Sequence, residues 1–291
     1  VYRKVRNTSR YLLGNLHDFN PATDAIPIAE LPLLDRWMLQ RTAEVMDDIT
    51  EAFESFEFFR FFQLLQNFCV TDLSNFYLDI AKDRLYVSAP ADQRRRSCQT
   101  VMALIIERLA GLIAPVLCHM AEDIWQNLPY PVEETSVFHR GWPTVPVEWR
   151  DAALSAPVQE LRELRAAVNK VLEDCRGRQE LGASLEAAVR IDARRPELQA
   201  ALSWLSETGD PEVDGLRDWL LVSQLQIGGE PWAEVLASQD DELASIEVSR
   251  ARGTKCERCW HYEGDVGQHP EHPHICGRCV GVLERRTHQL A

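Results

Sequence analysis

Four cysteines near the end of the chain have the residue type and spacing of a metal site. Cys256 and Cys259 form one C-x2-C pair, Cys276 and Cys279 form a second, and sixteen residues separate the pairs. This spacing is typical of a tetrahedral zinc site, in which four thiolates surround one ion at about 2.3 Å. Because four thiolates leave no position for water, we expect a structural ion, whose binding supplies folding free energy to a segment too short for its own core.

Two other chemistries stay open for this segment. The pairs could form disulfides or a redox C-x-x-C site, although two such pairs in a reducing compartment favour a metal. A histidine could replace one cysteine as a ligand; the candidates are His261, His269, His272 and His274. Four further cysteines lack paired spacing, and we interpret them as small buried apolar residues: Cys69, Cys98, Cys118 and Cys175.

The charge of the chain is strongly acidic but unevenly distributed. The formal net charge is −14, yet residues 250–291 carry seven lysines and arginines against five acidic residues. Weak non-specific binding of nucleic acid is therefore expected, and any RNA contact must be local. No apolar run reaches the ~18 residues of a membrane span, and no signal-peptide core follows the basic start. These features predict a cytoplasmic protein.

Hydrophobic periodicity predicts a helical chain before the cysteines. Apolar residues recur every three to four positions, which indicates an antiparallel bundle of five helices over about 1–17, 34–56, 58–80, 92–113 and 115–128. The aromatic stripe from Phe58 to Phe76 is interpreted as bundle core. A Pro- and Trp-bearing connector follows over 129–149. The chain begins with Val1 inside a predicted helix, so we expect a fragment of a longer polypeptide.

The pattern changes in the second half. A helix is predicted over 156–175, strands over 187–191, 220–227 and 245–248, and helices over 196–206 and 212–219. The predicted fold class is mainly α: an antiparallel helical bundle, then a small α+β junction domain, then a zinc knuckle. The predicted domains are residues 1–149, 150–250 and 251–291.

The sequence contains no phosphate-binding glycine loop and no histidine–carboxylate cluster of catalytic spacing, so we predict no catalytic residue. The zinc segment offers a different chemistry. Arg258 and Arg278 flank its ligands, and Trp260 follows the second cysteine. Basic groups around an exposed aromatic ring could stack on RNA bases. Alternatively, Trp260 caps the small zinc core.

Several strings resemble the bacterial-type isoleucyl-tRNA synthetases, members of class I, in the order found there. These are RNTSRYLLGNLHDF (6–19), LDRWML (34–39), DLSNFYLDIAKDRLY (72–86), LIAPVLCHMAEDIW (112–125), KCERCWHYEGDVG (255–267) and HPHICGRCV (272–280). The resemblance implies an anticodon-binding bundle over 1–149, a junction domain over 150–250 and a zinc domain over 251–291. The family's HIGH-type and KMSKS-type motifs are absent from the sequence. ATP, Mg²⁺ and the editing activity are therefore expected in missing catalytic and editing domains of the same polypeptide.

The implied parent reaction is the ATP-dependent joining of isoleucine to its tRNA by a ligase that is expected to be monomeric. This chain would hold the anticodon stem-loop of isoleucine tRNA. From charge and position we predict backbone contacts at Arg3, Arg6, Arg10 and Arg84, and contacts to bases or the loop at Arg258, Trp260 and Arg278. Two rivals remain: a DNA repair glycosylase, which carries a related finger, and a protein-interaction scaffold.

Overall fold

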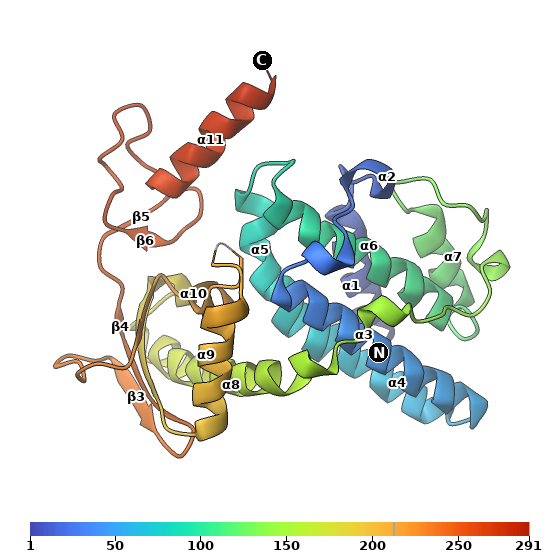
Figure 1. Ribbon diagram of the computed structural model, residues 1–291, viewed down its shortest axis with the longest axis horizontal. Helices are drawn as coiled ribbons and strands as arrows, with labels where there is room; N and C mark the ends of the chain where they lie inside the picture. The colour runs from blue at the N-terminus through green and yellow to red at the C-terminus, as the bar shows by residue number, and fades with distance from the viewer. Residues whose placement is uncertain (212, 291) are drawn as a thin grey trace. The chain divides into compact units, whose positions relative to one another are not determined.

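The computed structural model describes the backbone of residues 1–211 and 213–290 and the side chains of 1–211 and 213–285. The chain divides into two compact units, the first spanning Val1–Ala152 and the second beginning at Ala153 (Figure 1). In the described ranges, no helix is long and apolar enough to cross a lipid bilayer.

The first unit is the predicted helical bundle (Figure 1). Its longer helices are α1 (Tyr2–Gly14), α3 (Leu33–Glu54), α4 (Phe58–Asn67), α5 (Leu78–Val87), α6 (Gln93–Ile113) and α7 (Cys118–Gln126). Shorter turns are α2 (Pro21–Asp24), η1 (Ile28–Glu30), η3 (Val137–His139) and η4 (Val147–Trp149), and η5 (Ala152–Leu154) leads into the second unit.

Local signals set the helix starts, and apolar faces bring the helices together. α3 begins directly after Pro32, and the carboxylate of Asp92 caps α6 by accepting the N–H of Arg94 at 2.9 Å. α3 packs against both α4 and α6. The buried side chains that fill this core include Leu34, Met38, Phe61, Leu65, Ile105 and Leu109.

The predicted helix over 58–80 is longer and less regular than its periodicity indicated. α4 continues through a π-helical segment, η2 (Phe68–Tyr77), and then through α5 to Val87. Polar side chains satisfy this wider turn. Ser74 Oγ donates to the Cys69 carbonyl at 2.7 Å, and Arg41 Nε donates to Asp72 at 3.0 Å. Arg41, the partner of Asp72, lies on α3. The periodicity of residues 58–80 alone therefore could not have indicated the π-helical geometry.

The second unit contains a sheet, helices and the cysteine segment. Its helices are α8 (Ser155–Gly177), α9 (Pro196–Thr208), α10 (Leu216–Leu220) and α11 (Gly277–Leu290), with a short turn η6 (Ser184–Glu186). Its strands are β1 (Ala187–Ala193), β2 (Gln224–Ile227), β3 (Ala237–Asp240), β4 (Ala244–Arg250), β5 (Thr254–Lys255) and β6 (Tyr262–Glu263).

Four of these strands form a mixed sheet in the order β2-β1-β4-β3. β1 and β2 run parallel, whereas β1–β4 and β3–β4 are antiparallel, with Val189 opposite both Leu225 and Val248. Because side chains alternate across a strand, Val189, Ile191 and Ile246 share one face, which forms the core with α8 and α9. Ala188 and Arg190 lie on the other face.

Three features of this unit differ from the predictions. β3 was not predicted, because the edge strand ASQD has no apolar alternation. The strand predicted from residue 220 begins at Gln224, because Leu221 adopts a left-handed conformation (φ 54°) that ends α10. α11 was also not predicted. It follows the third cysteine and contains the fourth.

Candidate metal centre and nucleic-acid interface

The four cysteines predicted as metal ligands come together in one cluster. All four sulfurs lie within 4.8 Å of one another, and the Cys256–Cys279 and Cys259–Cys276 sulfurs are each 3.8 Å apart. A tetrahedron with metal–sulfur bonds of about 2.3 Å has edges of about 3.8 Å, so the cluster fits one zinc ion. Disulfide sulfurs lie only about 2.05 Å apart, and the four thiols are free, so the disulfide alternative is wrong.

The local backbone explains how the first pair forms. The N–H of Trp260 donates to the Cys256 carbonyl at 2.9 Å, and the N–H of Cys256 donates to the His261 carbonyl at 2.8 Å. Trp260 accordingly has a left-handed backbone (φ 67°), which is unusual for a bulky residue. This tight turn brings Cys259 back beside Cys256.

Hydrogen-bond donors surround the sulfurs. The N–H of Cys276 lies 3.4 Å from Cys256 Sγ, and Arg258 Nη1 lies 3.7 Å from Cys279 Sγ. Such donors delocalise the charge of thiolates that share one cation and orient the ligands. Arg258 is therefore partly committed to the metal centre.

In the described part of the chain, no histidine joins the cluster, since its group of potential metal ligands contains only the four cysteines. His261 is buried at 3 % exposure but lies outside that group. His269 instead contacts Asp265, whose carboxylate also accepts the N–H of Gly277 at 2.7 Å. The Gly277 hydrogen bond, followed by that of His269, lowers the pKa of Asp265. A Cβ at Gly277 would lie 2.7 Å from the same carboxylate, so a larger residue there would displace the Asp265 side chain.

Side-chain contacts tie the metal segment to the sheet of its own unit. Ser223 Oγ accepts the N–H of Tyr262 at 2.8 Å and donates to the Leu185 carbonyl at 2.5 Å. Arg217 Nη1 contacts Glu263 at 3.2 Å. The zinc segment is thus braced at β6 as well as by its ligands.

Trp260 lies on the outside of the turn. The residue is 61 % exposed, and Lys255 Nζ lies 5.6 Å from the ring centroid. This exposure argues against the alternative in which Trp260 caps the zinc core. An exposed ring beside a cation has the chemistry of a stacking surface for a nucleobase. Arg278 is half-buried in the first turn of α11.

The predicted basic residues of α1 occupy its exposed face. Arg3, Arg6 and Arg10 are all exposed, and none makes an ion pair with any residue that the structure describes. Arg6 and Arg10 lie three and seven positions after Arg3. The three arginines therefore share one face of α1 and span about 10 Å along the helix axis.

Two hollows beside α1 contain polar residues that the sequence did not single out. Their volumes are about 510 and 380 Å³. The Tyr86 hydroxyl, on a ring 59 % exposed, donates to that of Tyr11 at 3.2 Å. Asn75 and Lys82 line the second hollow. The only sequence signal for these hollows was that Tyr11 lies four positions after Asn7, on the same face of α1. Tyr86 lies on α5, and only the fold brings it beside Tyr11.

Arg84, predicted as a backbone contact, requires a correction. It is 2 % exposed inside the bundle, where its guanidinium donates to both carboxylate oxygens of Asp35, one of them at 3.1 Å. Asp35 also accepts the Tyr77 hydroxyl at 2.5 Å. Burial alone would lower the pKa of Arg84, but Asp35 raises it, so the guanidinium stays charged. Because internal acceptors occupy it, Arg84 cannot reach a phosphate.

Comparisons with known proteins agree with this arrangement. Residues 35–191 match the anticodon-binding domain of tRNA ligase, and residues 253–281 match the zinc finger found in FPG and IleRS. The whole chain aligns over 290 residues with an isoleucine–tRNA ligase of Parasynechococcus marenigrum (strain WH8102). The identity is 89 %, and the alignment covers 30 % of that ligase. Two further relatives align over 286 residues, which is 98 % of this chain and 30 % of each relative. The identity is 76 % to the isoleucine–tRNA ligase of Prochlorococcus marinus (strain MIT 9313) and 78 % to that of Synechococcus sp. (strain CC9311).

The chain therefore spans about 30 % of the length of the curated relatives that it matches. The anticodon-domain match extends beyond the first compact unit, through α8 and into β1. Neither the domain match nor these relatives support the alternative of a DNA repair glycosylase. The zinc-finger match and the sulfur geometry agree on one zinc ion bound by the four cysteines.

Proposed function

We propose a function from the premise that this chain belongs to the anticodon-binding domains of tRNA ligases. It binds the anticodon stem-loop of isoleucine tRNA as part of an isoleucine–tRNA ligase. The observation that carries the proposal is the 89 % identity to such a ligase along the whole chain. The parent enzyme would use ATP to join isoleucine to its tRNA. This chain would supply recognition, while ATP and Mg²⁺ would bind the catalytic domain.

The zinc knuckle supports the base contacts in this proposal. Anticodon bases can be splayed out of their stack and read by aromatic rings and hydrogen-bond donors. Trp260 presents an exposed ring on a turn that the metal ligands hold rigid, so little conformational entropy is lost on stacking. Arg278 and the exposed part of Arg258 would contact the loop beside that base.

The exposed face of α1 supports the phosphate contacts. Arg3, Arg6 and Arg10 carry no internal ion pair in the described residues, so they can replace counterions on an RNA strand without breaking a native contact. The net negative charge of the chain would disfavour phosphate contacts away from such basic residues. We exclude Arg84 from the proposal because it is buried.

The remaining parts of the parent ligase would be the other partners, and we propose that it works as a cytoplasmic monomer. The turn between α3 and α4 suits contact with such a part. Phe56 and Phe59 are 78 % and 76 % exposed there, and Phe56 holds a left-handed backbone (φ 57°). Large exposed aromatic side chains often mark interaction surfaces.

The test is binding of the zinc-loaded chain to isoleucine tRNA and to a non-cognate tRNA across a salt series. We expect tighter binding of the isoleucine tRNA. We define the salt slope as the magnitude of the slope of the logarithm of the binding constant against the logarithm of the salt concentration. Each of Arg3→Gln, Arg6→Gln and Arg10→Gln should reduce it by about 0.7–0.9 for each phosphate that is no longer neutralised. Arg60→Gln is the matched control, because Arg60 lies among acidic partners at the start of α4. Equal binding of both tRNAs, with unchanged slopes in all variants, would refute the proposal.

A further inference from the structure

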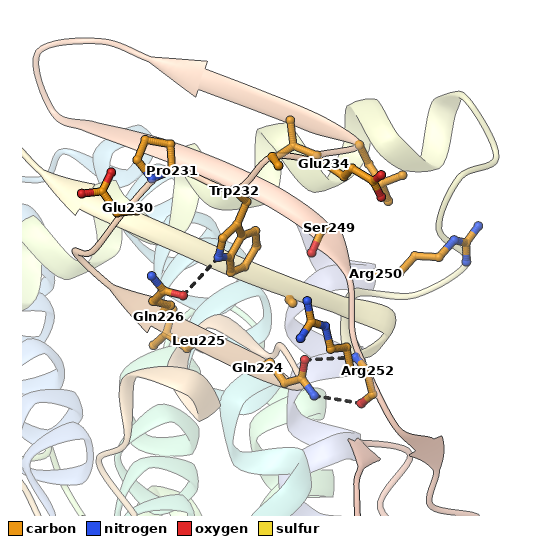
Figure 2. A pocket seen from close by; sticks show the side chains of 14 residues that line it. Gln224, Leu225, Gln226, Glu230, Pro231, Trp232, Glu234, Ser249, Arg250 and Arg252 are labelled. Carbon is orange, nitrogen blue, oxygen red and sulfur yellow. Dashed lines mark hydrogen bonds between the residues drawn. The ribbon is translucent and has the colours of Figure 1, made fainter.

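A large hollow lies on the sheet face opposite the core of the second unit. Its volume is about 1120 Å³, and Figure 2 shows the side chains that line it. Ala188, Gln224, Gln226 and Ser249 form its floor; they alternate with core residues along β1, β2 and β4. The segment 230–236 forms one wall. Ligand sites are commonly concave and have volumes of about 300–1,000 Å³, so this hollow could hold a small planar ligand.

Trp232 is held in place on that wall. Its backbone N–H donates to Glu247 at 2.9 Å, and its indole N–H donates to Gln226 at 3.1 Å. Glu247 is itself fixed by Arg190, at 3.3 Å, directly across the β1–β4 ladder. The indole ring is therefore oriented before any ligand arrives, which reduces the entropic cost of stacking on it.

Two arginines supply positive charge. The amide of Gln224 accepts the N–H of Arg252 at 3.0 Å and donates to its carbonyl at 2.8 Å, so the backbone of Arg252 is fixed. In Figure 2, its side chain extends toward the Trp232 ring, whereas that of Arg250 points away from it at the edge. Neither guanidinium makes an ion pair with any residue in the described part of the chain.

We propose that this hollow binds one unstacked RNA nucleotide, with the base against Trp232 and its phosphate near Arg252. This inference rests on the proposed function and adds a second base site, separate from Trp260. An aromatic face combined with a nearby unpaired guanidinium matches the base and the phosphate of one nucleotide. In Figure 2, Glu230 lies on the far side of Trp232 from Arg252, and its carboxylate would repel a phosphate there. It would thus favour the strand direction that places the phosphate near Arg252.

The test uses the zinc-loaded chain and a hairpin RNA with the anticodon stem-loop sequence of isoleucine tRNA. Binding is followed by fluorescence anisotropy in a salt series. Trp232→Leu should weaken binding by about 5- to 150-fold, the range that stacking of one base supplies. Arg252→Gln should lower the salt slope by about 0.7. Trp204→Leu and Arg194→Gln are the matched controls, because Trp204 lies on α9 and Arg194 already pairs with Asp240.

A second measurement distinguishes a local effect on RNA binding from unfolding. Zinc content and far-ultraviolet circular dichroism should be unchanged in both pocket variants. A hairpin with 4-thiouridine in its loop should cross-link to peptides from 224–236 or 249–252. Normal hairpin binding by Trp232→Leu and Arg252→Gln, without such cross-links, would overturn this inference and leave the proposed function intact. Failure of the unaltered chain to bind the hairpin would overturn both.

Discussion

Ser223 accepts the backbone N–H of Tyr262 at 2.8 Å and thereby joins the start of β2 to the zinc segment. Ser223 is 1 % exposed and donates its own proton to the Leu185 carbonyl. One hydroxyl therefore satisfies two partly buried backbone groups from segments far apart in the sequence. The zinc turn is anchored to the sheet as well as to its metal.

We expect Ser223→Ala to lower the free energy of unfolding by about 1–2 kcal/mol, because two partly buried backbone groups lose their hydrogen-bond partner. Urea denaturation of the zinc-loaded chain measures the loss. Ser203→Ala on the exposed side of α9 is the control and should change stability by less than about 0.5 kcal/mol. Equal stability of the two variants would contradict this role of Ser223.

Removal of the metal should unfold the cysteine segment and leave the bundle helical. Freshly purified protein should contain one zinc per chain, and Cys256→Ser should greatly reduce that content because one tetrahedral ligand is lost. Cys118→Ser is the control, since Cys118 lies on α7 of the bundle and, contrary to the sequence-based interpretation, is exposed. Elemental analysis and protease sensitivity of residues 253–285 test the prediction. Absence of metal with all four thiols free would contradict it.

Replacement of Trp260 should separate RNA binding from stability. Its left-handed backbone costs about 1–2 kcal/mol for a residue with a Cβ, so Trp260→Gly should keep or raise the stability of the zinc turn. The same change should weaken tRNA binding by about 5- to 150-fold, because stacking of one base is lost. Metal-release kinetics and tRNA titrations give the two readings. Unchanged tRNA affinity would exclude a stacking role.

Acid should weaken the bundle through Asp18. Partial burial alone would raise its pKa, but hydrogen bonds from Arg95 and Gln99 and the charges of Arg95 and Arg96 lower it to about 2. Because the folded pKa lies below the unfolded value of about 3.9, this stabilisation is present above pH 4 and is lost as the pH falls through 2. The stability difference between the natural chain and Asp18→Asn should therefore shrink between pH 5 and 2. Zinc loss at low pH is common to both proteins and cancels in this difference.

Arg84 should act on folding and not on RNA. Removing one partner of a buried ion pair typically costs about 3–5 kcal/mol, so Arg84→Ala should destabilise the bundle strongly. The double variant Asp35→Leu, Arg84→Met removes both charges and should recover part of the loss. Where the protein remains folded, its salt slope for tRNA should match that of the natural chain. A reduced slope would show that Arg84 reaches the phosphates after all.

Local patterns were sufficient for much of this fold. The helices of the bundle follow from apolar residues at three-to-four spacing, because that period places them on one face that must be buried. The zinc site follows from two C-x2-C pairs, because the short spacing brings the two cysteines of each pair together, on a turn for the first pair and at the start of α11 for the second, and the metal itself joins the pairs. Exposed arginines on α1 could likewise be predicted, since charged residues opposite an apolar face are solvated.

Only the tertiary structure decided which polar residues face inward and which segments meet. Arg84 has the sequence surroundings of a surface residue, yet Asp35, forty-nine positions away, supplies the partner that makes its burial possible. The Trp232 hollow depends on the order β2-β1-β4-β3, which brings together residues from three strands. The sequence alone determined a helical bundle and a four-thiolate zinc turn, because those signals are short-range. Long-range pairing of charges and strands carries no local period, so the buried ion pair, the edge strand and the Trp232 hollow emerged only on folding.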